Sequence, residues 1–247
     1  MSKIVIIGAG AMGSAFALPC LDNNHDINIV GTHLENDFID QLKQNDNLHP
    51  GLNTKIPKEI KIFKFEKFDE ILKSNVDLIV LGISSKGIEW VADQLSRLFK
   101  DNKIPKLLML TKGLSIYNNQ YELLVDKLKR LLSEKGTNKL NISAVGGPCL
   151  ASGLANRVHS SVVIANKDFM TAKKIADMMN TSYYHTSYSA DINGVEVSAA
   201  IKNIFSMAIG AAKGLCSRNI SSEIREKNYL NTASALIKQS IYEMEIF

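Results

Sequence analysis

Three glycines near the amino terminus have the spacing at which a backbone turn can bind a phosphate. Gly8, Gly10 and Gly13 form the pattern G-x-G-x-x-G. The pattern directly follows Lys3–Ile7, an apolar run typical of a buried strand, and opens a stretch typical of a helix. The first glycine permits a tight turn, the second lets the backbone approach a pyrophosphate, and the third lets the helix pack on the strand. The pattern predicts a dinucleotide-binding loop, and a glycine turn arising by chance is the alternative.

The end of the next expected strand, Asp26–Val30, bears on which dinucleotide is bound. An Asp or Glu at that end would hydrogen-bond the 2′-hydroxyl of the ribose and select NAD. The sequence instead continues with Gly31, Thr32 and His33, and Glu35 lies close by. NAD and NADP are therefore both consistent with the sequence. Thr32 and His33 are candidate contacts near the 2′ position, or else ordinary loop residues.

Two further strand ends carry side chains that could contact a ligand. Ligands of open α/β sheets bind at the carboxyl ends of the strands. The segment T-K-G places the ammonium group of Lys112 at one such end, where it would attract an anion; the alternative is a solvated loop lysine. Cys149 follows Gly147 at another end. No adjacent His or Arg pattern supports a nucleophilic thiol, so a packing or polar-contact role is favoured for Cys149.

A lysine interrupts the middle of a long apolar stretch. Gly194–Leu215 is rich in Ala, Ile and Val and is expected to form a largely buried helix. A lysine inside such a helix is costly unless it is paired or functional, and burial would lower its pKa. Lys202 is therefore a candidate proton donor or acceptor. The alternative is a lysine whose stem packs in the core while its ammonium group reaches water.

The order of the expected elements indicates the fold. Short apolar strands alternate with helices as far as residue 188, which predicts an α/β fold: a Rossmann-type doubly wound parallel sheet followed by a short all-helical carboxyl-terminal part. We expect a dinucleotide-binding domain over residues 1–188 and an incomplete helical substrate domain over 189–247. The expected strands are 3–7, 26–30, 59–63, 76–82, 106–110, 141–145, 160–165 and 182–186; the expected helices are 11–21, 38–44, 68–73, 88–99, 121–133, 171–180, 194–215 and 231–245, with a polar stretch over 216–227.

The composition indicates a globular protein in a reducing compartment. Of the 247 residues, 45% are hydrophobic and 22% are charged; the net charge is +4 without a block of like charge, so nucleic acid is not an expected partner. The three cysteines form no C-x-x-C pair and the five histidines lack ligand spacing, which argues against a disulfide framework and a metal site. With no secretory signal and no apolar run long enough to cross a bilayer, we expect a cytoplasmic protein without a membrane span.

Taken together, these segments resemble the NAD(P)-dependent glycerol-3-phosphate dehydrogenase family in its bacterial and archaeal cytosolic form. The resemblance covers nearly the whole chain. Its most specific part is G-V-E-x-x-x-x-x-K-N, whereas the glycine loop is shared with many dehydrogenases. The matching segments are I-I-G-A-G-A-M-G at the start, H-P-G-L after Asn47, T-K-G-L at Thr111, V-G-G-P-C-L-A at Val145, D-I-N-G-V-E-V-S-A-A-I-K-N-I-F-S-M-A-I-G at Asp191 and N-T-A-S-A-L-I-K-Q-S-I-Y-E-M at Asn231.

The resemblance implies reversible hydride transfer between the nicotinamide of NAD or NADP and C2 of dihydroxyacetone phosphate, a small phosphorylated substrate. It makes Lys202 the catalytic acid/base and Asn203 a substrate contact, and we expect a homodimer. The other implied contacts are Lys112, Gly147 and Cys149 to the substrate, and Gly8, Gly10, Ala11, Met12, Gly13, Lys112 and Ala151 to the cofactor.

The chain departs from the family pattern in two places. The family's helical domain continues with G-x-x-D and G-x-R-N segments that complete the substrate site, and these have no counterpart before Phe247. The acid of the family's G-P-x-x-A-x-E pattern is replaced by Gly153.

Four interpretations follow: a truncated form of a true dehydrogenase, a short relative completed by dimerisation, a dinucleotide-binding protein without turnover, and a reductase of another small keto acid resembling ketopantoate reductase. The T-K-G-L and G-V-E…K-N segments count against the last. The binding-protein interpretation predicts an exposed apolar patch on Gly194–Leu215.

Overall fold

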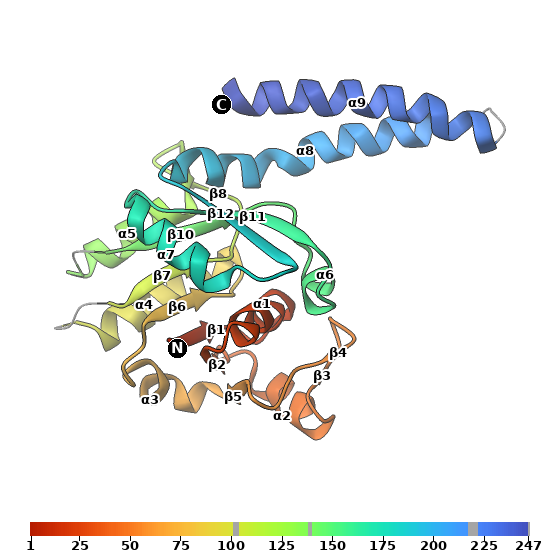
Figure 1. The fold of residues 1–247 in the computed structure, drawn as a ribbon. Helices are drawn as coiled ribbons and strands as arrows, with labels where there is room; N and C mark the ends of the chain where they lie inside the picture. The colour runs from red at the N-terminus through yellow and green to blue at the C-terminus, as the bar shows by residue number, and fades with distance from the viewer. Residues whose placement is uncertain (101–103, 138–139, 217–221, 247) are drawn as a thin grey trace.

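One large sheet positions the candidate site residues. In the computed structural model, which describes residues 1–100, 104–137, 140–216 and 222–246, eight strands form this sheet in the order β12-β11-β10-β7-β6-β1-β2-β5 (Figure 1). The strand order reverses between β1 and β6, and ligands of such sheets bind in the crevice at this reversal. The sheet strands are β1 (Lys3–Ile7), β2 (Asp26–Val30), β5 (Lys61–Phe63), β6 (Leu78–Leu81), β7 (Lys106–Met109), β10 (Ile142–Gly146), β11 (Ser160–Ala165) and β12 (Tyr184–Ser189); two short pairs lie outside it, β3 (Leu48–His49) with β4 (Thr54–Lys55) and β8 (Leu114–Tyr117) with β9 (Gln120–Leu123).

Helices cover both faces of the sheet. In β1, Ile4 and Ile6 point into the buried cluster that includes α1, α6 and α7, whereas Val5 and Ile7 point into the cluster that includes α3, α4 and α5. Because successive strand residues face opposite sides, a strand covered on both faces is apolar at every position. The helices of this part are α1 (Ala11–Asp22), α2 (Asn36–Gln44), α3 (Phe68–Leu72), α4 (Ile88–Leu98), α5 (Leu124–Glu134), α6 (Ala151–Ala155) and α7 (Phe169–Met179).

The sheet is parallel except where β10 meets β11. These two strands run antiparallel, with Val145 opposite Ile164, and the other neighbouring pairs of the described sheet are parallel. The short helix α6 connects them without crossing the sheet, so β11 begins at the edge where β10 ends. The predicted α/β fold with a doubly wound, predominantly parallel sheet is confirmed, with this one reversal added.

A hairpin that the sequence analysis did not predict follows β7. β8 and β9 pair around Asn118 and Asn119, whose φ angles are +50° and +59°. Asparagine tolerates this left-handed conformation, and two adjacent residues with positive φ make the tight turn that suits a hairpin. α5 therefore begins at Leu124, and the prediction of a helix from Tyr121 is wrong at its start.

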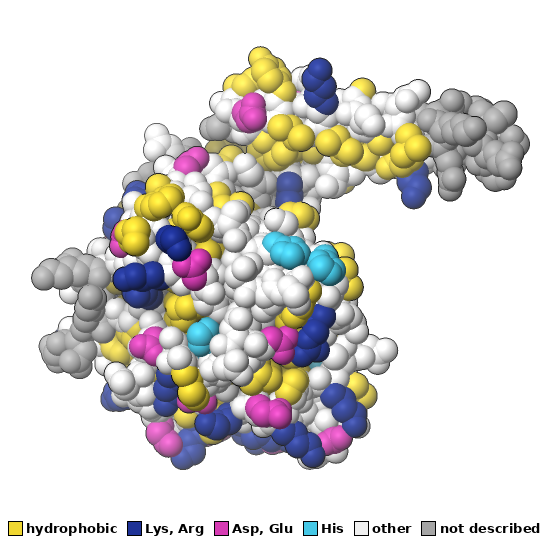
Figure 2. All heavy atoms as spheres, in the orientation of Figure 1, with side chains coloured by type: hydrophobic (Ala, Val, Ile, Leu, Met, Phe, Trp, Pro, Cys, Tyr) yellow, Lys and Arg dark blue, Asp and Glu magenta, His cyan; other side chains and the backbone are white. Residues whose placement is uncertain are grey.

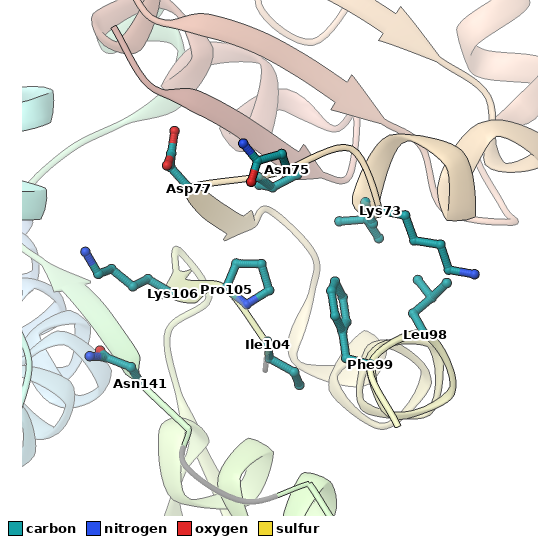
Figure 3. Close-up of a pocket in the computed structure, with 11 residues that line it drawn as sticks. Lys73, Asn75, Asp77, Leu98, Phe99, Ile104, Pro105, Lys106 and Asn141 are labelled. Atoms are coloured by element: carbon teal, nitrogen blue, oxygen red, sulfur yellow. The ribbon is translucent and has the colours of Figure 1, made fainter. Parts of the chain in front are cut away.

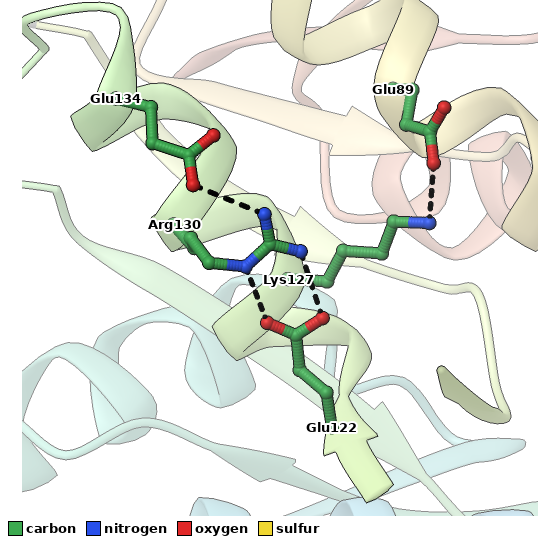
Figure 4. A network of polar contacts seen from close by, with 5 residues as sticks. All are labelled: Glu89, Glu122, Lys127, Arg130 and Glu134. Carbon is green, nitrogen blue, oxygen red and sulfur yellow. Dashed lines mark hydrogen bonds and ion pairs between the residues drawn. The ribbon is translucent and has the colours of Figure 1, made fainter. Parts of the chain in front are cut away.

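An arginine holds this hairpin against α5. Arg130 donates to both carboxylate oxygens of Glu122 in β9, at 2.8 and 3.0 Å, and also to Glu134 one turn farther along α5 (Figure 4). Its guanidinium carbon lies 3.8 Å from the centre of the Tyr117 ring in β8. Since the planar guanidinium can pair with a carboxylate and stack on a ring at the same time, one side chain fixes both strands.

The last two helices form a hairpin that projects from the sheet (Figure 1). α8 (Ile192–Cys216) packs at its start on β10, and α9 (Ser222–Ile246) folds back along it. Many side chains of α8 beyond Lys202 are exposed, including Ile204 at 63% and Met207 at 72%. The prediction that this helix is largely buried is therefore wrong. The helix is apolar on several sides, and α9 covers one of them.

The second helix starts earlier than the sequence predicted. A polar stretch was expected over 216–227 and a helix from 231. Residues 217–221 lie outside the described residues, and α9 already begins at Ser222.

By length and composition alone, the segment Ile192–Leu215 could cross a bilayer. The expectation that no segment is long and apolar enough to cross a bilayer is wrong by this criterion. That expectation considered only uninterrupted apolar runs, whereas this helix meets the criterion although it contains Glu196 and Lys202. An exposed apolar helix is equally typical of a surface that packs against another protein.

A buried carboxylate attaches α8 to the sheet domain. Glu196 is 6% exposed and accepts the backbone N–H of Val125, in the first turn of α5, at 3.3 and 3.4 Å. It thereby satisfies a donor that the start of a helix leaves unpaired. Val195 approaches β10 so closely that a Cβ on Gly146 would lie 2.7 Å from its Cγ1. Burial raises the pKa of the Glu196 carboxyl to about 7, and the charge of Asp126 adds to the rise.

The titration of Glu196 tests this attachment. Its pKa rises from 4.5 to about 7 on folding, so the folded state binds the proton more tightly and the free energy of unfolding falls as the pH rises through this window. The fall should be on the order of 3 kcal/mol. Glu196→Gln keeps the shape and one acceptor oxygen but does not titrate. We expect its stability relative to the parent to be greater at pH 8 than at pH 5, measured by urea unfolding.

The matched control is Glu70→Gln, which removes an exposed carboxylate from α3. The difference in unfolding free energy between this variant and the parent should be the same at both pH values. A stability difference between Glu196→Gln and the parent that does not change with pH would contradict the buried, titrating carboxyl.

Candidate active site

The glycine loop shows why each of its three positions holds glycine. Gly8 has a φ of +106°, and a Cβ there would lie 2.7 Å from the carbonyl oxygen of Gly82. A Cβ on Gly13 would collide with the carbonyl oxygen of Gly8. At Gly10 the nearest atom to such a Cβ is Oε1 of Glu35, 3.9 Å away, so this position is open. Two glycines thus bring α1 against the ends of β1 and β6, and the third leaves space above the turn.

α1 begins on this open side of the loop. Gly10 precedes its first turn without a side-chain cap, and Ala11 and Met12 start the helix. The first turn of a helix has backbone N–H groups without intrahelical partners, and its dipole favours negative charge. The uncapped turn and the open position at Gly10 fit the pyrophosphate of a dinucleotide. Ala11 and Met12 lie where they would line it.

Both backbone polar groups of Ala9, inside the glycine loop, contact side chains that are distant in the sequence. Its N–H donates to Oε1 of Glu35 at 3.1 Å, and its carbonyl oxygen lies 3.2 Å from Nε2 of His49. This second contact is a hydrogen bond when Nε2 carries the hydrogen. His49 is 3% exposed, and burial is the main cause that lowers its pKa. Neither contact was predicted from the sequence, in which His49 is part of the H-P-G-L match and Glu35 lies near the end of β2.

Thr32 and His33, which follow β2, make different contacts. The N–H of Thr32 donates to Oε2 of Glu35 at 2.7 Å, which joins Thr32 to the glycine loop through that carboxylate. His33 is exposed, and its ring centre lies 5.1 Å from that of Trp90 and 6.2 Å from that of Phe65. Thr32 is thus connected to the dinucleotide loop only through its main chain and Glu35, whereas His33 is part of a neighbouring aromatic group.

Two lysines from different parts of the chain meet at one backbone carbonyl. Nζ of Lys112 donates to the carbonyl oxygen of Gly147 at 3.2 Å, and Nζ of Lys202 donates to the same oxygen at 3.1 Å. The N–H of Cys149 also donates to it at 3.1 Å. Lys112 follows β7, Gly147 follows β10, and Lys202 is on α8. The structure therefore brings these four candidate residues together at the carboxyl edge of the sheet.

The conformation of Gly147 directs this carbonyl. Its φ is +132°, a region that favours glycine, and a Cβ would lie 2.7 Å from the carbonyl oxygen of Ser161 and 2.9 Å from Cα of Val162. Any other residue would have to shift either its own backbone or β11. The tight packing behind Gly147 thus fixes the acceptor that both lysines share.

The charges at this point are unbalanced. Burial lowers the pKa of Lys112, and the nearby charge of Lys202 lowers it further. Within the described structure, neither lysine forms an ion pair with a carboxylate. Burial raises the pKa of the Cys149 thiol, which agrees with a packed residue rather than a nucleophile. Two ammonium groups beside a neutral carbonyl can attract an anion or stabilise a developing negative charge.

A cleft of about 790 Å³ opens beside the paired lysines. Gly147, Lys202 and Ser198 line it, together with Met244 from the end of α9. Asn203 is exposed and does not line this cleft in the described part of the chain, because the next position along a helix points about 100° away. Ala151, the remaining cofactor candidate, is half-buried at the start of α6.

A second cavity, of about 610 Å³, lies at the opposite ends of the strands (Figure 3). Asp77 and Lys106, at the starts of β6 and β7, line it with Phe99 after α4. Ligands of open α/β sheets bind at the carboxyl ends of strands, and this cavity lies at the amino ends. None of the candidate site residues lines it.

Among the described residues, no group of three or more His, Cys, Asp or Glu side chains could hold a metal ion. His159 and His185 form an exposed pair, with ring nitrogens 3.1 Å apart.

Comparisons with known proteins agree with this geometry. The sequence profile of the N-terminal part of NAD-dependent glycerol-3-phosphate dehydrogenases matches residues 3–172. The chain belongs to this family. A curated relative, the NADP(+)-dependent glycerol-3-phosphate dehydrogenase of Archaeoglobus fulgidus, is 30% identical over 215 residues, which cover 87% of this chain and 62% of the relative. A glycerol-3-phosphate dehydrogenase [NAD(P)+] of Shouchella clausii is 27% identical and is covered to 61%.

Solved structures of the family share the fold. The glycerol-3-phosphate dehydrogenase of Coxiella burnetii matches with a TM-score of 0.74 and 20% identity, over 99% of this chain and 67% of that chain. The Plasmodium falciparum enzyme matches with a TM-score of 0.75 and 20% identity, over 98% of this chain and 64% of that chain. The chain spans about three fifths of the length of the curated family members that it matches.

Gly147→Ala tests the constraint on the shared carbonyl. A Cβ at this position meets backbone atoms of β11 and forces a φ that alanine rarely adopts, so the variant should lose about 1–3 kcal/mol of unfolding free energy. Thermal and urea unfolding measure the loss. The control is Gly153→Ala in α6, where a Cβ would meet Val158 at an ordinary 3.8 Å; it should be neutral or gain up to about 1 kcal/mol. Equal stability of the two variants would show that Gly147 is not constrained.

Proposed function

We propose that this chain binds a nicotinamide dinucleotide, NAD or NADP, and transfers a hydride between it and a small phosphorylated substrate, interconverting dihydroxyacetone phosphate and glycerol 3-phosphate. The observation that carries the proposal is the convergence of Lys112 and Lys202 on the Gly147 carbonyl, at 3.2 and 3.1 Å. This pair lies at the carboxyl edge of the same sheet that carries the glycine loop. Cofactor and substrate would therefore bind side by side.

The glycine loop supports the cofactor part of the proposal. The open position at Gly10 and the uncapped first turn at Ala11 and Met12 would bind the pyrophosphate. When bound, the nicotinamide supplies or accepts the hydride. Lys112, which follows β7, and Ala151, which begins α6 after β10, would contact the nicotinamide half if it extends beyond β6.

The paired lysines support the chemical part of the proposal. In reduction, the hydride adds to C2 of the ketone and the electron pair of the C=O bond moves to oxygen. Lys202 would donate a proton from Nζ to that oxygen and become a neutral amine, which solvent then reprotonates. In the reverse direction the neutral amine would take the hydroxyl proton. Lys112, held beside it, would stabilise the oxyanion or the substrate phosphate by its charge.

A second candidate function, cofactor binding without turnover, is favoured by Asn203. This residue is exposed and lies outside the cleft rather than beside Lys202. In this alternative the glycine loop binds the dinucleotide as proposed, and the exposed side of α8 contacts a partner. The activity of the parent protein, measured beside a Lys202 variant, distinguishes the two functions.

Lys202→Ala should abolish the proton transfer while preserving cofactor binding. We expect the oxidation of NADH or NADPH in the presence of dihydroxyacetone phosphate to fall by at least about 100-fold, and the affinity for the reduced cofactor to change by less than about threefold. The control is Lys213→Ala, which removes a lysine farther along the same helix and should retain activity. Cofactor binding without any oxidation by the parent would favour the second candidate function.

We further propose that the chain forms a homodimer through the exposed face of the α8–α9 hairpin. Figure 2 shows hydrophobic side chains along this arm. If each exposed apolar side chain buries about 100 Å², a face that includes six of them would bury on the order of 600 Å² per copy, which is at the lower end of the range for stable protein interfaces. Two helical hairpins packed face to face would form a four-helix arrangement. The exposed apolar residues are Ile204, Met207 and Leu215 on α8 and Leu230, Ile237, Ile241, Tyr242 and Ile246 on α9.

Met207→Glu tests the dimer. Met207 is 72% exposed on α8, and a carboxylate there cannot be buried in an interface without a partner, so the variant should sediment as a monomer at concentrations where the parent is a dimer. Met170→Glu places the same charge on α7, at a side chain that is 55% exposed, and should leave the dimer intact. A parent that sediments as a monomer, or that requires detergent to remain in solution, would contradict the proposal.

A further inference from the structure

Two exposed histidines meet on the last two strands of the sheet. Nδ1 of His159 lies 3.1 Å from Nε2 of His185. The rings are nearly stacked, with centres 5.3 Å apart and planes inclined at 29°. The two residues are 26 positions apart in the sequence, so only the folded chain shows that they are neighbours.

The pairing of β11 with β12 places both side chains on one face. Ser161 lies opposite His185 in the parallel register, and His159 is two residues before Ser161. Because alternate residues of a strand share a face, the two histidines project from the same side. The N–H of Ser160 donates to the carbonyl of Tyr183 at 2.8 Å, which continues the strand pairing to this end. The opposite face of both strands contributes to the buried core, so the pair stands on a fixed support.

We propose that His159 and His185 bind one divalent transition-metal ion between them. Imidazole nitrogens bind such ions at about 2.0–2.1 Å, so two nitrogens 3.1 Å apart would subtend an angle of roughly 95–100° at the ion. This angle lies between the value of about 90° for neighbouring ligands of an octahedral or square-planar ion and about 109° for a tetrahedral ion. The spacing therefore fits Ni²⁺, Cu²⁺ or Zn²⁺, ions for which imidazole is a suitable ligand.

The hydrogen bond between the two rings is compatible with this role. Without an ion, one ring donates its N–H to the other. For both nitrogens to bind an ion, the donor ring must carry its hydrogen on its second nitrogen, which changes its tautomer and leaves its charge unchanged. Among the described residues, none hydrogen-bonds the second nitrogen of either ring. Both side chains are exposed, so the rings can turn until their lone pairs converge on the ion.

The surroundings indicate an open site from which the ion exchanges. Within the described part of the chain, no third His, Cys, Asp or Glu joins the pair, so water would complete the coordination. Arg157, two residues before His159, is bound by Asp22 through two nitrogens at 2.9 Å each, which offsets its charge. Neither histidine lines the cleft beside Lys202. The ion would join the edge strand β12 to β11 and take no part in the proposed hydride transfer.

Titration of the full chain with NiCl₂ tests the site. The measurements are made at about pH 7.5, where free imidazole is neutral and can bind a metal. Isothermal titration calorimetry should show saturable binding of a single ion per chain. The midpoint of thermal unfolding should rise with Ni²⁺ and return to its starting value with EDTA, because an ion that binds the folded chain stabilises it.

Single substitutions assign the ion to the pair. His159→Gln and His185→Gln should each weaken Ni²⁺ binding by at least about tenfold, because the remaining ligand loses the effective concentration that the second one provides. Each should also abolish the rise in the unfolding midpoint. The matched control is His33→Gln, which removes another exposed histidine and should change the affinity by less than about twofold. Circular dichroism in EDTA checks that all three variants are folded.

Diffraction at the nickel absorption edge from a crystal soaked in NiCl₂ locates the ion directly. The expected anomalous peak lies about 2 Å from Nδ1 of His159 and from Nε2 of His185. Absence of binding by the parent, an affinity that neither substitution in the pair lowers, or a peak at other residues would overturn the proposal.

Discussion

The carbonyl oxygen of Gly147 joins the parts of the molecule on which its chemistry depends. It accepts the N–H of Cys149 in its own turn, Nζ of Lys112 from the end of β7 and Nζ of Lys202 from α8. Two ammonium groups at one acceptor repel each other, and the partial negative charge of the carbonyl offsets this repulsion only in part. The arrangement is held because Gly147 is packed against β11 in a conformation that favours glycine. A substrate anion would supply the negative charge that is missing beside the two ammonium groups.

The position of Lys202 depends on how α8 is attached. Glu196 binds the start of α5, and Val195 lies against Gly146, so the first turns of α8 are fixed to the sheet. Farther along, the helix contacts α9 on one side and is exposed on others. The proposed catalytic lysine is therefore at the junction between a rigid domain and a projecting helical hairpin. A second copy packed on that hairpin would stabilise the junction.

Much of the sheet domain could be predicted from the sequence, because strands buried on both faces are uniformly apolar and glycines mark the turns that must be tight. The burial of α8 could not, since hydrophobicity shows that a helix has apolar sides but not which of them are covered. The β8–β9 hairpin was missed although two adjacent asparagines, Asn118 and Asn119, were the available signal. Glu35 was not assigned because the acid was sought at the strand end, whereas the chain turns back and delivers it from the start of α2. That Lys112 and Lys202 share one carbonyl could not be predicted from the sequence, because only the three-dimensional fold brings them together.

The most direct test of the proposed function is a crystal structure of the chain with a reduced nicotinamide cofactor and dihydroxyacetone phosphate. We expect the pyrophosphate on the glycine loop, the nicotinamide at the carboxyl edge of the sheet, and the C2 oxygen of the substrate about 3 Å from Nζ of Lys202, with Lys112 beside it. A complex in which the substrate binds elsewhere, with both lysines still donating to Gly147, would refute the proposed catalytic role of the two lysines.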